Sequence, residues 1–219
     1  MISDGLLSPE QNESQAKETI NHILLQAKNP CICFSGGKKS LVLLHLIKSV
    51  SKKPLNVIFI DTTAHFDNTR NYVEKMRRFW GFYLISATPA VKIDNIAMDK
   101  DFCCNSLFIS PLWQIIQKNG FDYVFIGSIR TENRIERLLD TTLKKKDCVF
   151  VSPIENFLTE DIWHYIHAYN LPYCSLYDIG YSRLDCKPCS VMDESRQNNI
   201  LNPDDEDLII EKLKKLGYL

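Results

Sequence analysis

The stretch Cys31-Ile32-Cys33-Phe34-Ser35-Gly36-Gly37-Lys38-Lys39-Ser40 decides the fold. An apolar run ends abruptly in Ser-Gly-Gly-Lys, and a second apolar run, residues 41–47, follows directly. This order predicts a buried strand, a glycine turn and the start of a buried helix.

The glycine turn has the composition of an anion site. Adjacent glycines let backbone N–H groups approach an anion closely, and a helix start leaves N–H groups unpaired and favours negative charge. Hydroxyl and ammonium groups add to this. We therefore expect a phosphate or pyrophosphate site formed by Ser35, Gly36, Gly37, Lys38, Lys39 and Ser40. The spacing is neither that of a Walker A loop, whose first glycine is replaced here by Ile32, nor the Gly-x-Gly-x-x-Gly of dinucleotide-binding folds. The alternative is an ordinary turn between two core elements.

Strands and helices alternate along the chain. We expect helices over residues 8–28, 39–50, 67–80, 106–118 and 159–169, and strands over 31–34, 54–61, 82–86, 122–127 and 149–153. Alternation of this kind predicts an α/β fold with a mostly parallel sheet between two helical layers. We expect a single domain over residues 1–219: an N-terminal helix in 1–29, a core that contains the anion site in 30–190, and a helical tail in 191–219.

Polar residues follow two of the predicted strands. Asp61 and Thr62 end one of them, at the sheet edge where open α/β folds bind ligands. Gly127 ends another, and Arg130 and Arg134 come soon after it, placed to clamp phosphate or sulfate groups. The alternatives are a turn role for Asp61 and a solvated, salt-paired helix face for the arginines.

Length, composition and charge narrow the function classes. The chain has 219 residues and a net charge of −1, which gives no overall field to attract nucleic acid or an acidic membrane. No secretory signal and no apolar run long enough to span a membrane are evident, so we expect a cytoplasmic protein.

Four of the eight cysteines form a pattern. Cys103 and Cys104 are adjacent, and Cys186 and Cys189 have the Cys-x-x-Cys spacing. Four thiolates suit a 4Fe–4S cluster or a zinc ion, and the adjacent pair, which needs a bend to face one centre, favours iron–sulfur. The alternative is a redox dithiol at Cys186 and Cys189. The other four cysteines are expected to be small buried hydrophobes.

Together these motifs resemble the PAPS/APS reductase (sulfonucleotide reductase) family, which belongs to the PP-loop adenine-nucleotide alpha hydrolases. Residues 35–40 are similar to the Ser-Gly-Gly-Lys-Asp-Ser loop, with Lys39 in place of Asp, and residues 61–66 are similar to Asp-Thr-Gly-x-His-Phe. Residues 127–130 resemble Gly-x-Arg-Arg, with Ile129 in place of the first Arg. Residues 153–165 and 171–181 resemble two further family segments, the second of which also occurs in FAD synthetases.

The resemblance implies an adenine-nucleotide-binding protein that acts on a sulfonucleotide. Residues 30–190 are then the nucleotide-binding core with the cluster, and Cys103, Cys104, Cys186 and Cys189 are the 4Fe–4S ligands. Reductases of the family carry a nucleophilic Cys near the C-terminus, and this sequence has none after Cys189. We therefore expect the thiol to come from a partner, a thiol or electron donor protein, or from another residue.

Two other functions stay open. One is an ATP-using sulfurtransferase in which Lys38 and Ser40 hold pyrophosphate, Asp61 helps to place Mg²⁺, and nucleic acid is one acceptor. The other is a non-catalytic nucleotide-binding protein that carries a cluster. A homo-oligomer is compatible with each of the three.

Overall fold

A computed structural model describes residues 7–51, 53–91, 98–129 and 148–193. Its main sheet has five parallel strands in the order β3-β2-β1-β4-β5, with β1 (Pro30–Cys33) at the centre. The other four are β2 (Asn56–Ile60), β3 (Tyr83–Ala87), β4 (Tyr123–Phe125) and β5 (Val149–Val151). The predicted parallel sheet is confirmed.

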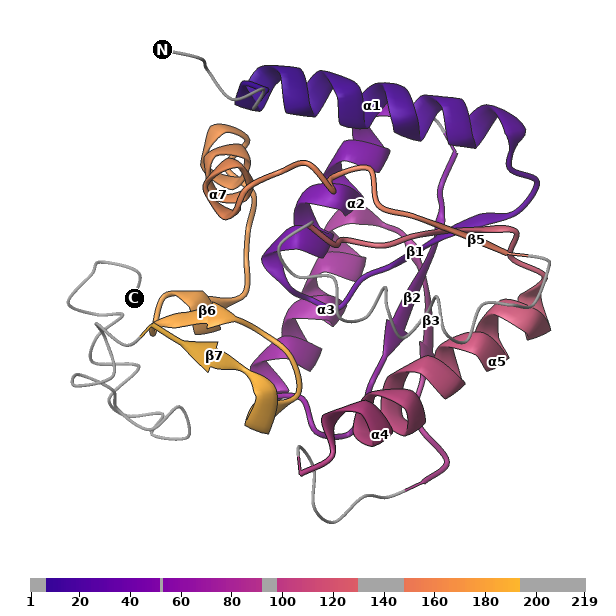
Figure 1. Cartoon of the computed structure of the whole chain (residues 1–219), viewed down its shortest axis with the longest axis vertical. Helices are drawn as coiled ribbons and strands as arrows, with labels where there is room; N and C mark the ends of the chain where they lie inside the picture. Colours follow the sequence, from indigo (N-terminus) through magenta and orange to yellow (C-terminus); the bar gives the residue numbers. More distant parts are fainter. Residues whose placement is uncertain (1–6, 52, 92–97, 130–147, 194–219) are drawn as a thin grey trace.

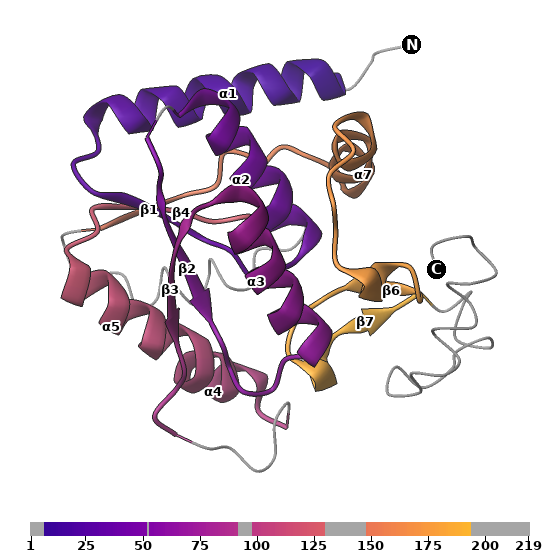
Figure 2. The same ribbon diagram turned by 180° about the vertical axis from the view of Figure 1, so that it is seen from behind.

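Helices cover both faces of this sheet, as the two views show (Figures 1 and 2). One face carries the larger core, which joins α1 (Pro9–Gln26), α2 (Lys38–Val50), α3 (Asp67–Trp80) and α7 (Thr159–Ala168). The other face packs against η1 (Asn105–Ile109) and α5 (Ser110–Asn119), preceded by α4 (Lys100–Cys104). The predicted three-layer α/β architecture is therefore confirmed.

Local sequence explains why α2 starts where it does. Gly36 has φ +78°, a conformation that glycine adopts without strain, and its missing Cβ leaves room for Thr69 and Val73 of α3. After the turn, eight of the first ten residues of α2, residues 38–47, are buried, so the core packs against this helix on nearly every side.

A two-stranded antiparallel hairpin follows α7 and η3 (Ser175–Tyr177). Its strands are β6 (Tyr181–Arg183) and β7 (Val191–Met192), and the turn η4 (Lys187–Cys189) lies between them. We call residues 181–192 the cysteine hairpin, because they carry Cys186 and Cys189. The sequence did not predict these two short strands.

Three predicted regions lie outside the described residues: Arg130, Arg134 and the helical tail after residue 193. Among the described helices, none has both the length and the apolar content needed to cross a membrane.

Candidate functional site

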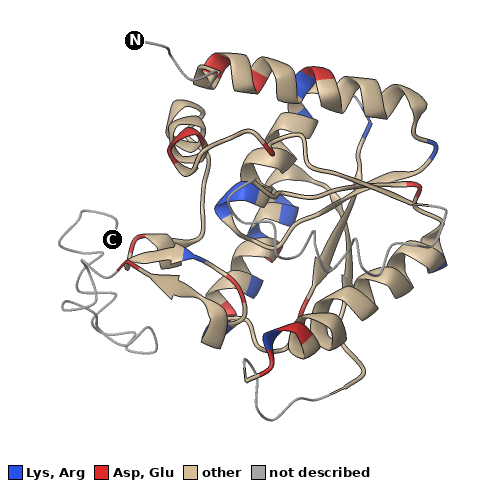
Figure 3. Cartoon of the chain, viewed as in Figure 1, with Lys and Arg blue, Asp and Glu red and all other residues tan. Residues whose placement is uncertain are grey.

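The predicted phosphate site, residues 35–40, forms the turn between β1 and α2, at the carboxyl end of the central strand. The Ser35 and Ser40 hydroxyls lie 3.2 Å apart, and the Gly37 N–H points to Ser35 Oγ at 3.4 Å. Gly37 caps α2 and has no side chain to accept from the helix N–H groups. Lys and Arg residues colour this start of α2 blue in Figure 3. The turn thus combines hydroxyls, backbone donors and positive charge in one place.

Lys38 is turned away from bulk solvent. Only 7% of it is exposed, and its Nζ donates to the carbonyl oxygen of Ser182 at 2.6 Å. The ammonium also lies over the rings of Trp163 and Tyr177, 5.3 and 5.4 Å from their centroids. The Lys38 backbone N–H donates to the Tyr177 hydroxyl at 2.9 Å. Lys38 therefore connects the phosphate loop to β6 of the cysteine hairpin.

Gly127 brings the end of β4 against the phosphate loop. A Cβ on Gly127 would lie 2.8 Å from both the backbone N and the Cα of Ser40. Real Cβ atoms do not approach backbone so closely, so only glycine lets these two segments touch. The structure thereby explains the glycine at this position through packing beside the loop.

Asp61 and Thr62 follow β2 in the loop beside the phosphate site. Asp61 Oδ1 accepts the Thr63 N–H, and Asp61 Oδ2 accepts Arg70 Nε, each at 2.9 Å. His65 lies between this loop and the core: its Nδ1 is 3.7 Å from Asp61 Oδ1 and 3.4 Å from Thr62 Oγ1. Burial lowers the pKa of His65, although the nearby Asp61 charge opposes that shift. Asp61 thus holds this loop in place through its two hydrogen bonds.

The cysteine hairpin is attached to the same loop. Thr62 Oγ1 lies 3.1 Å from Cys186 Sγ, and the Lys187 N–H donates to the Ala64 carbonyl at 2.7 Å. Burial raises the pKa of the Cys186 thiol, and the hydrogen bond with Thr62 lowers it. The Cys-x-x-Cys turn therefore lies close to the carboxyl end of β2.

Cys103 and Cys104 end α4, directly before the π-helical turn η1. We expected a bend here, but both cysteines have helical backbone, so their side chains point about 100° apart around the axis. Cys103 is buried, and its charge contributes to the raised pKa of Cys186, as does that of Cys189. A π-helical turn is a frequent feature of functional sites. The four predicted ligands thus come from two segments, α4 and the cysteine hairpin.

The chemistry of this donor set fits a thiolate centre, since iron–sulfur clusters and structural zinc both take four cysteines. Within the described residues, however, no three His, Cys, Asp or Glu side chains are arranged to hold a metal ion. The ligand sphere is therefore not formed in this structure.

Of the remaining cysteines, Cys31 and Cys174 are buried as expected, whereas Cys33 and Cys148 are only partly buried and pack against the core. Burial raises the pKa of Cys33 to about 12 and that of Cys148 and Cys174 to about 11, and Cys31 is fully buried. Such thiols are protonated and unreactive at neutral pH.

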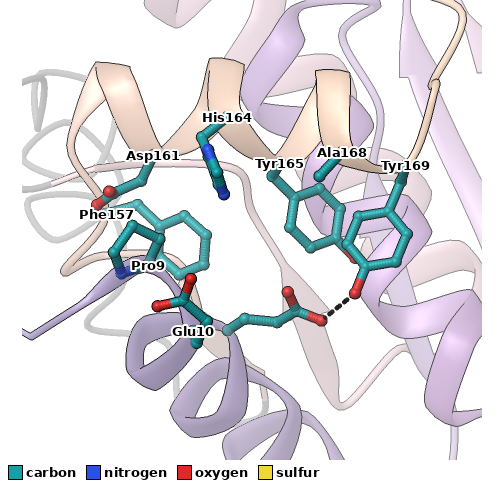
Figure 4. A pocket seen from close by; sticks show the side chains of 9 residues that line it. Pro9, Glu10, Phe157, Asp161, His164, Tyr165, Ala168 and Tyr169 are labelled. Atoms are coloured by element: carbon teal, nitrogen blue, oxygen red, sulfur yellow. Dashed lines mark hydrogen bonds between the residues drawn. The ribbon is translucent and has the colours of Figure 1, made fainter.

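A separate cavity of about 360 Å³ lies between α1 and α7 (Figure 4). Its lining mixes carboxylates and aromatic rings, and Tyr169 donates to Glu13 across it at 2.7 Å. None of the residues predicted for the site lines this cavity.

Comparison with known proteins now bears on this geometry. The model of the phosphoadenosine phosphosulfate reductase domain matches residues 29–192. The chain belongs to this family. The match spans β1 to β7 and contains the phosphate loop, the loop after β2 and all four candidate ligands.

Relatives within the PAPS reductase family agree with this assignment. Adenosine 5'-phosphosulfate reductase of Bacillus cereus is 30% identical over 171 residues, which is 72% of this chain and 71% of that protein. An uncharacterised protein of Methanocaldococcus jannaschii is 32% identical over 184 residues, 77% of this chain but only 38% of that protein.

Solved structures show the same fold. The PAPS reductase of Candida auris, a phosphate complex, has a TM-score of 0.67 at 21% identity and covers 84% of this chain and 98% of that one. FMN adenylyltransferase of Candida glabrata has a TM-score of 0.66 at 18% identity, with 99% and 84% covered. The expected adenine-nucleotide alpha hydrolase-like fold is confirmed.

Sequence reasoning missed three contacts of the site. Arg70, which holds Asp61, follows Asp67 by three residues on α3, a spacing that signals an ion pair. The Tyr177 hydroxyl and the Ser182 carbonyl gave no such signal, because each meets Lys38 from more than 130 residues away in the sequence.

Proposed function

We propose that this protein binds a sulfonucleotide, adenosine 5'-phosphosulfate (APS) or phosphoadenosine phosphosulfate (PAPS), and takes part in its reduction. The observation that carries the proposal is the position of Cys186, whose Sγ lies 3.1 Å from Thr62 in the loop beside the phosphate turn. The Cys-x-x-Cys turn and the predicted phosphate turn thus lie at the same edge of the sheet, where open α/β folds bind ligands. The family of the chain supports the same substrate class.

In this proposal the nucleotide phosphate binds to the turn between β1 and α2. The binding groups are the backbone of Gly36 and Gly37, the hydroxyls of Ser35 and Ser40, and the charge of the two lysines, Lys38 and Lys39. Thr62 and Gly127 shape the walls of the site, and Asp61 fixes the loop after β2. Arg130 and Arg134 are proposed to hold the sulfo group and lie outside the described residues.

The four cysteines are proposed to hold a 4Fe–4S cluster, with Cys103 and Cys104 from α4 and Cys186 and Cys189 from the hairpin. Such a cluster, when bound, supplies a redox-active centre whose potential depends on the hydrogen bonds to its sulfurs. Thr62, which contacts Cys186 Sγ, is one such hydrogen-bonding residue. Zinc on the same four thiolates is the alternative.

Reduction of the sulfonucleotide needs two thiols. A thiolate attacks the sulfur of the sulfo group, the S–O bond to the nucleotide breaks, and the nucleotide leaves as the phosphate. A second thiol then attacks the S-sulfo adduct, which releases sulfite and leaves a disulfide. We assign both thiols to a separate thiol donor protein, because the cluster engages the four cysteines of this site.

Ligand binding tests the proposal. Protein purified without oxygen is titrated with APS, PAPS and ATP in separate calorimetry experiments. Binding of APS or PAPS at least tenfold tighter than ATP is the expected result. ATP binding with pyrophosphate release would instead favour the sulfurtransferase function, with nucleic acid as an acceptor and Mg²⁺ as a cofactor. Binding of a nucleotide without turnover would leave the non-catalytic nucleotide-binding function, and no binding of any of the three contradicts the proposal.

Metal analysis tests the cluster separately. We expect iron, acid-labile sulfide and a visible absorbance shoulder, all lost in Cys103→Ser and Cys186→Ser. Cys148→Ser is the matched control, since this cysteine lies outside the proposed ligand set. A colourless protein that contains zinc and no iron contradicts the 4Fe–4S assignment.

A further inference from the structure

Two neighbouring lysines at the start of α2 have different surroundings. The Lys38 side chain is buried, and its Nζ contacts the Ser182 carbonyl at 2.6 Å. Lys39 is partly exposed at the second position of the same helix. Because successive helical residues point about 100° apart, the two ammonium groups leave the loop in different directions.

The surroundings of Lys38 are those of a structural contact. A buried ammonium needs hydrogen-bond acceptors, and here the Ser182 carbonyl and the faces of Trp163 and Tyr177 surround it. The Lys38 backbone N–H is also engaged, since it donates to the Tyr177 hydroxyl. The ammonium and the backbone N–H of Lys38 therefore both donate to the segment 177–182, which leads into the cysteine hairpin.

The hairpin has two sets of attachments to the rest of the protein. At β6, Lys38 holds Ser182, and the Tyr181 ring packs on Phe66 at 5.1 Å between centroids. At the cysteine turn, the Lys187 N–H donates to Ala64, and Cys186 contacts Thr62. The loop after β2 supplies every one of these contacts except that from Lys38. Lys38 thus links the hairpin to the phosphate loop itself.

We propose that Lys38 is a positioning residue that holds the cysteine hairpin against the phosphate loop, and that Lys39 is the lysine that contacts the nucleotide phosphate. The part concerning Lys39 rests on the proposed function, whereas the part concerning Lys38 does not. The two lysines then differ in their direct contacts: Lys38 sets the place of Cys186 and Cys189 and adds only its charge to the loop, and Lys39 contacts the anion.

The test compares Lys38→Met with Lys39→Met, and Lys48→Met is the matched control on the exposed last turn of α2. Amide hydrogen exchange is measured on the full-length protein as purified, and APS binding is measured by calorimetry. In Lys38→Met we expect exchange of residues 181–192 to rise about fivefold or more, with exchange of α5 unchanged. We expect APS affinity to fall less in Lys38→Met than in Lys39→Met. In Lys39→Met, amide exchange of the hairpin should equal that of the wild type.

Lys38→Arg separates positioning from general damage. Arg retains a cationic donor that stacks on aromatic rings, so it restores part of the hairpin protection that Met removes. If Lys38→Met does not fold, Lys38→Gln replaces it under the same criteria. Unchanged exchange of residues 181–192, no recovery with Arg, or an APS affinity loss as large as in Lys39→Met overturns the proposal. If the wild type binds no nucleotide, the proposed function fails while the exchange result still decides the role of Lys38.

Discussion

The Thr63 backbone N–H donates to Asp61 Oδ1 at 2.9 Å, and Thr63 has φ +65°, a left-handed conformation that β-branched residues rarely adopt. The Asp61 side chain, held from its other oxygen by Arg70, thus stabilises a strained turn. This turn sets the position of Thr62, whose hydroxyl meets Cys186. Backbone strain of this kind is often found at functional sites.

Thr63→Gly should stabilise the protein, because glycine adopts φ +65° without strain. Relief of about 1–2 kcal/mol outweighs the roughly 0.5–1 kcal/mol that glycine loses through its more flexible unfolded state. The exposed Thr63 side chain gives up little packing. We expect a higher free energy of unfolding in urea. Asn170→Gly is the matched control at φ +47°, with a smaller gain, since Asn tolerates this region. A lower free energy of unfolding for Thr63→Gly would show that the backbone at Thr63 is not strained.

Gly127→Ala should destabilise the fold by about 1–3 kcal/mol, because the new Cβ meets the backbone of Ser40 at 2.8 Å. Backbone atoms of a buried helix start cannot move aside as a flexible side chain can. Gly37→Ala provides the comparison: its φ is −81°, and its Cβ would meet nothing closer than Ser35 Oγ at 3.4 Å. Thermal denaturation of both variants should show the larger loss for Gly127→Ala, and equal losses would argue against the close contact.

Much of the fold follows from local sequence. The segment 67–80 is followed by Gly81, which has φ +66°, a left-handed conformation that ends a helix. The observed α3 therefore has the predicted bounds. Apolar strands such as Asn56–Ile60, buried on both faces, give a parallel sheet an unmistakable pattern. The helix from Lys100, by contrast, was expected only from Ser106, because its first turn, Lys-Asp-Phe-Cys-Cys, lacks an apolar stripe.

The candidate site was less predictable, because its contacts join distant segments. The positions of Gly36, Gly37 and Ser40 follow from the turn itself, but the direction of the Lys38 side chain depends on Ser182 and Trp163. A backbone carbonyl such as that of Ser182 carries no sequence signal. The roles of the site residues toward a ligand remain predictions that binding experiments decide.

Tyr177→Phe should cost about 1–3 kcal/mol of stability, because it leaves the buried Lys38 N–H without its acceptor. The phenyl ring keeps the packing against Trp163, so the loss reports the hydroxyl alone. Tyr173→Phe is the matched change: the Tyr173 hydroxyl donates to Asp178 at an exposed position, where water can replace it. Urea unfolding of the two variants measures the difference. A cost no larger for Tyr177→Phe than for Tyr173→Phe would show that the buried hydrogen bond contributes little.

Stability should fall as the pH drops below neutrality, in part because of His45. Its ring packs among Trp80, Tyr165 and Tyr169, and its Nδ1 lies 2.9 Å from the Tyr165 hydroxyl. Burial, and then the charge of Lys17, lower the pKa of His45 below its ordinary 6.5, whereas Glu13 opposes the shift.

Between the lowered pKa of His45 and 6.5, the unfolded chain therefore binds more protons than the native protein, so the free energy of unfolding rises with pH in this window. His65, whose pKa is also lowered by burial, adds a contribution of the same sign. His45→Gln should make the dependence shallower, by at most about 1.4 kcal/mol per pH unit. Urea unfolding at several pH values between 5 and 7.5 measures this slope. His22→Gln, on the exposed side of α1, is the matched control and should keep the slope of wild type. An unchanged slope in His45→Gln would mean that protonation of this ring does not oppose folding.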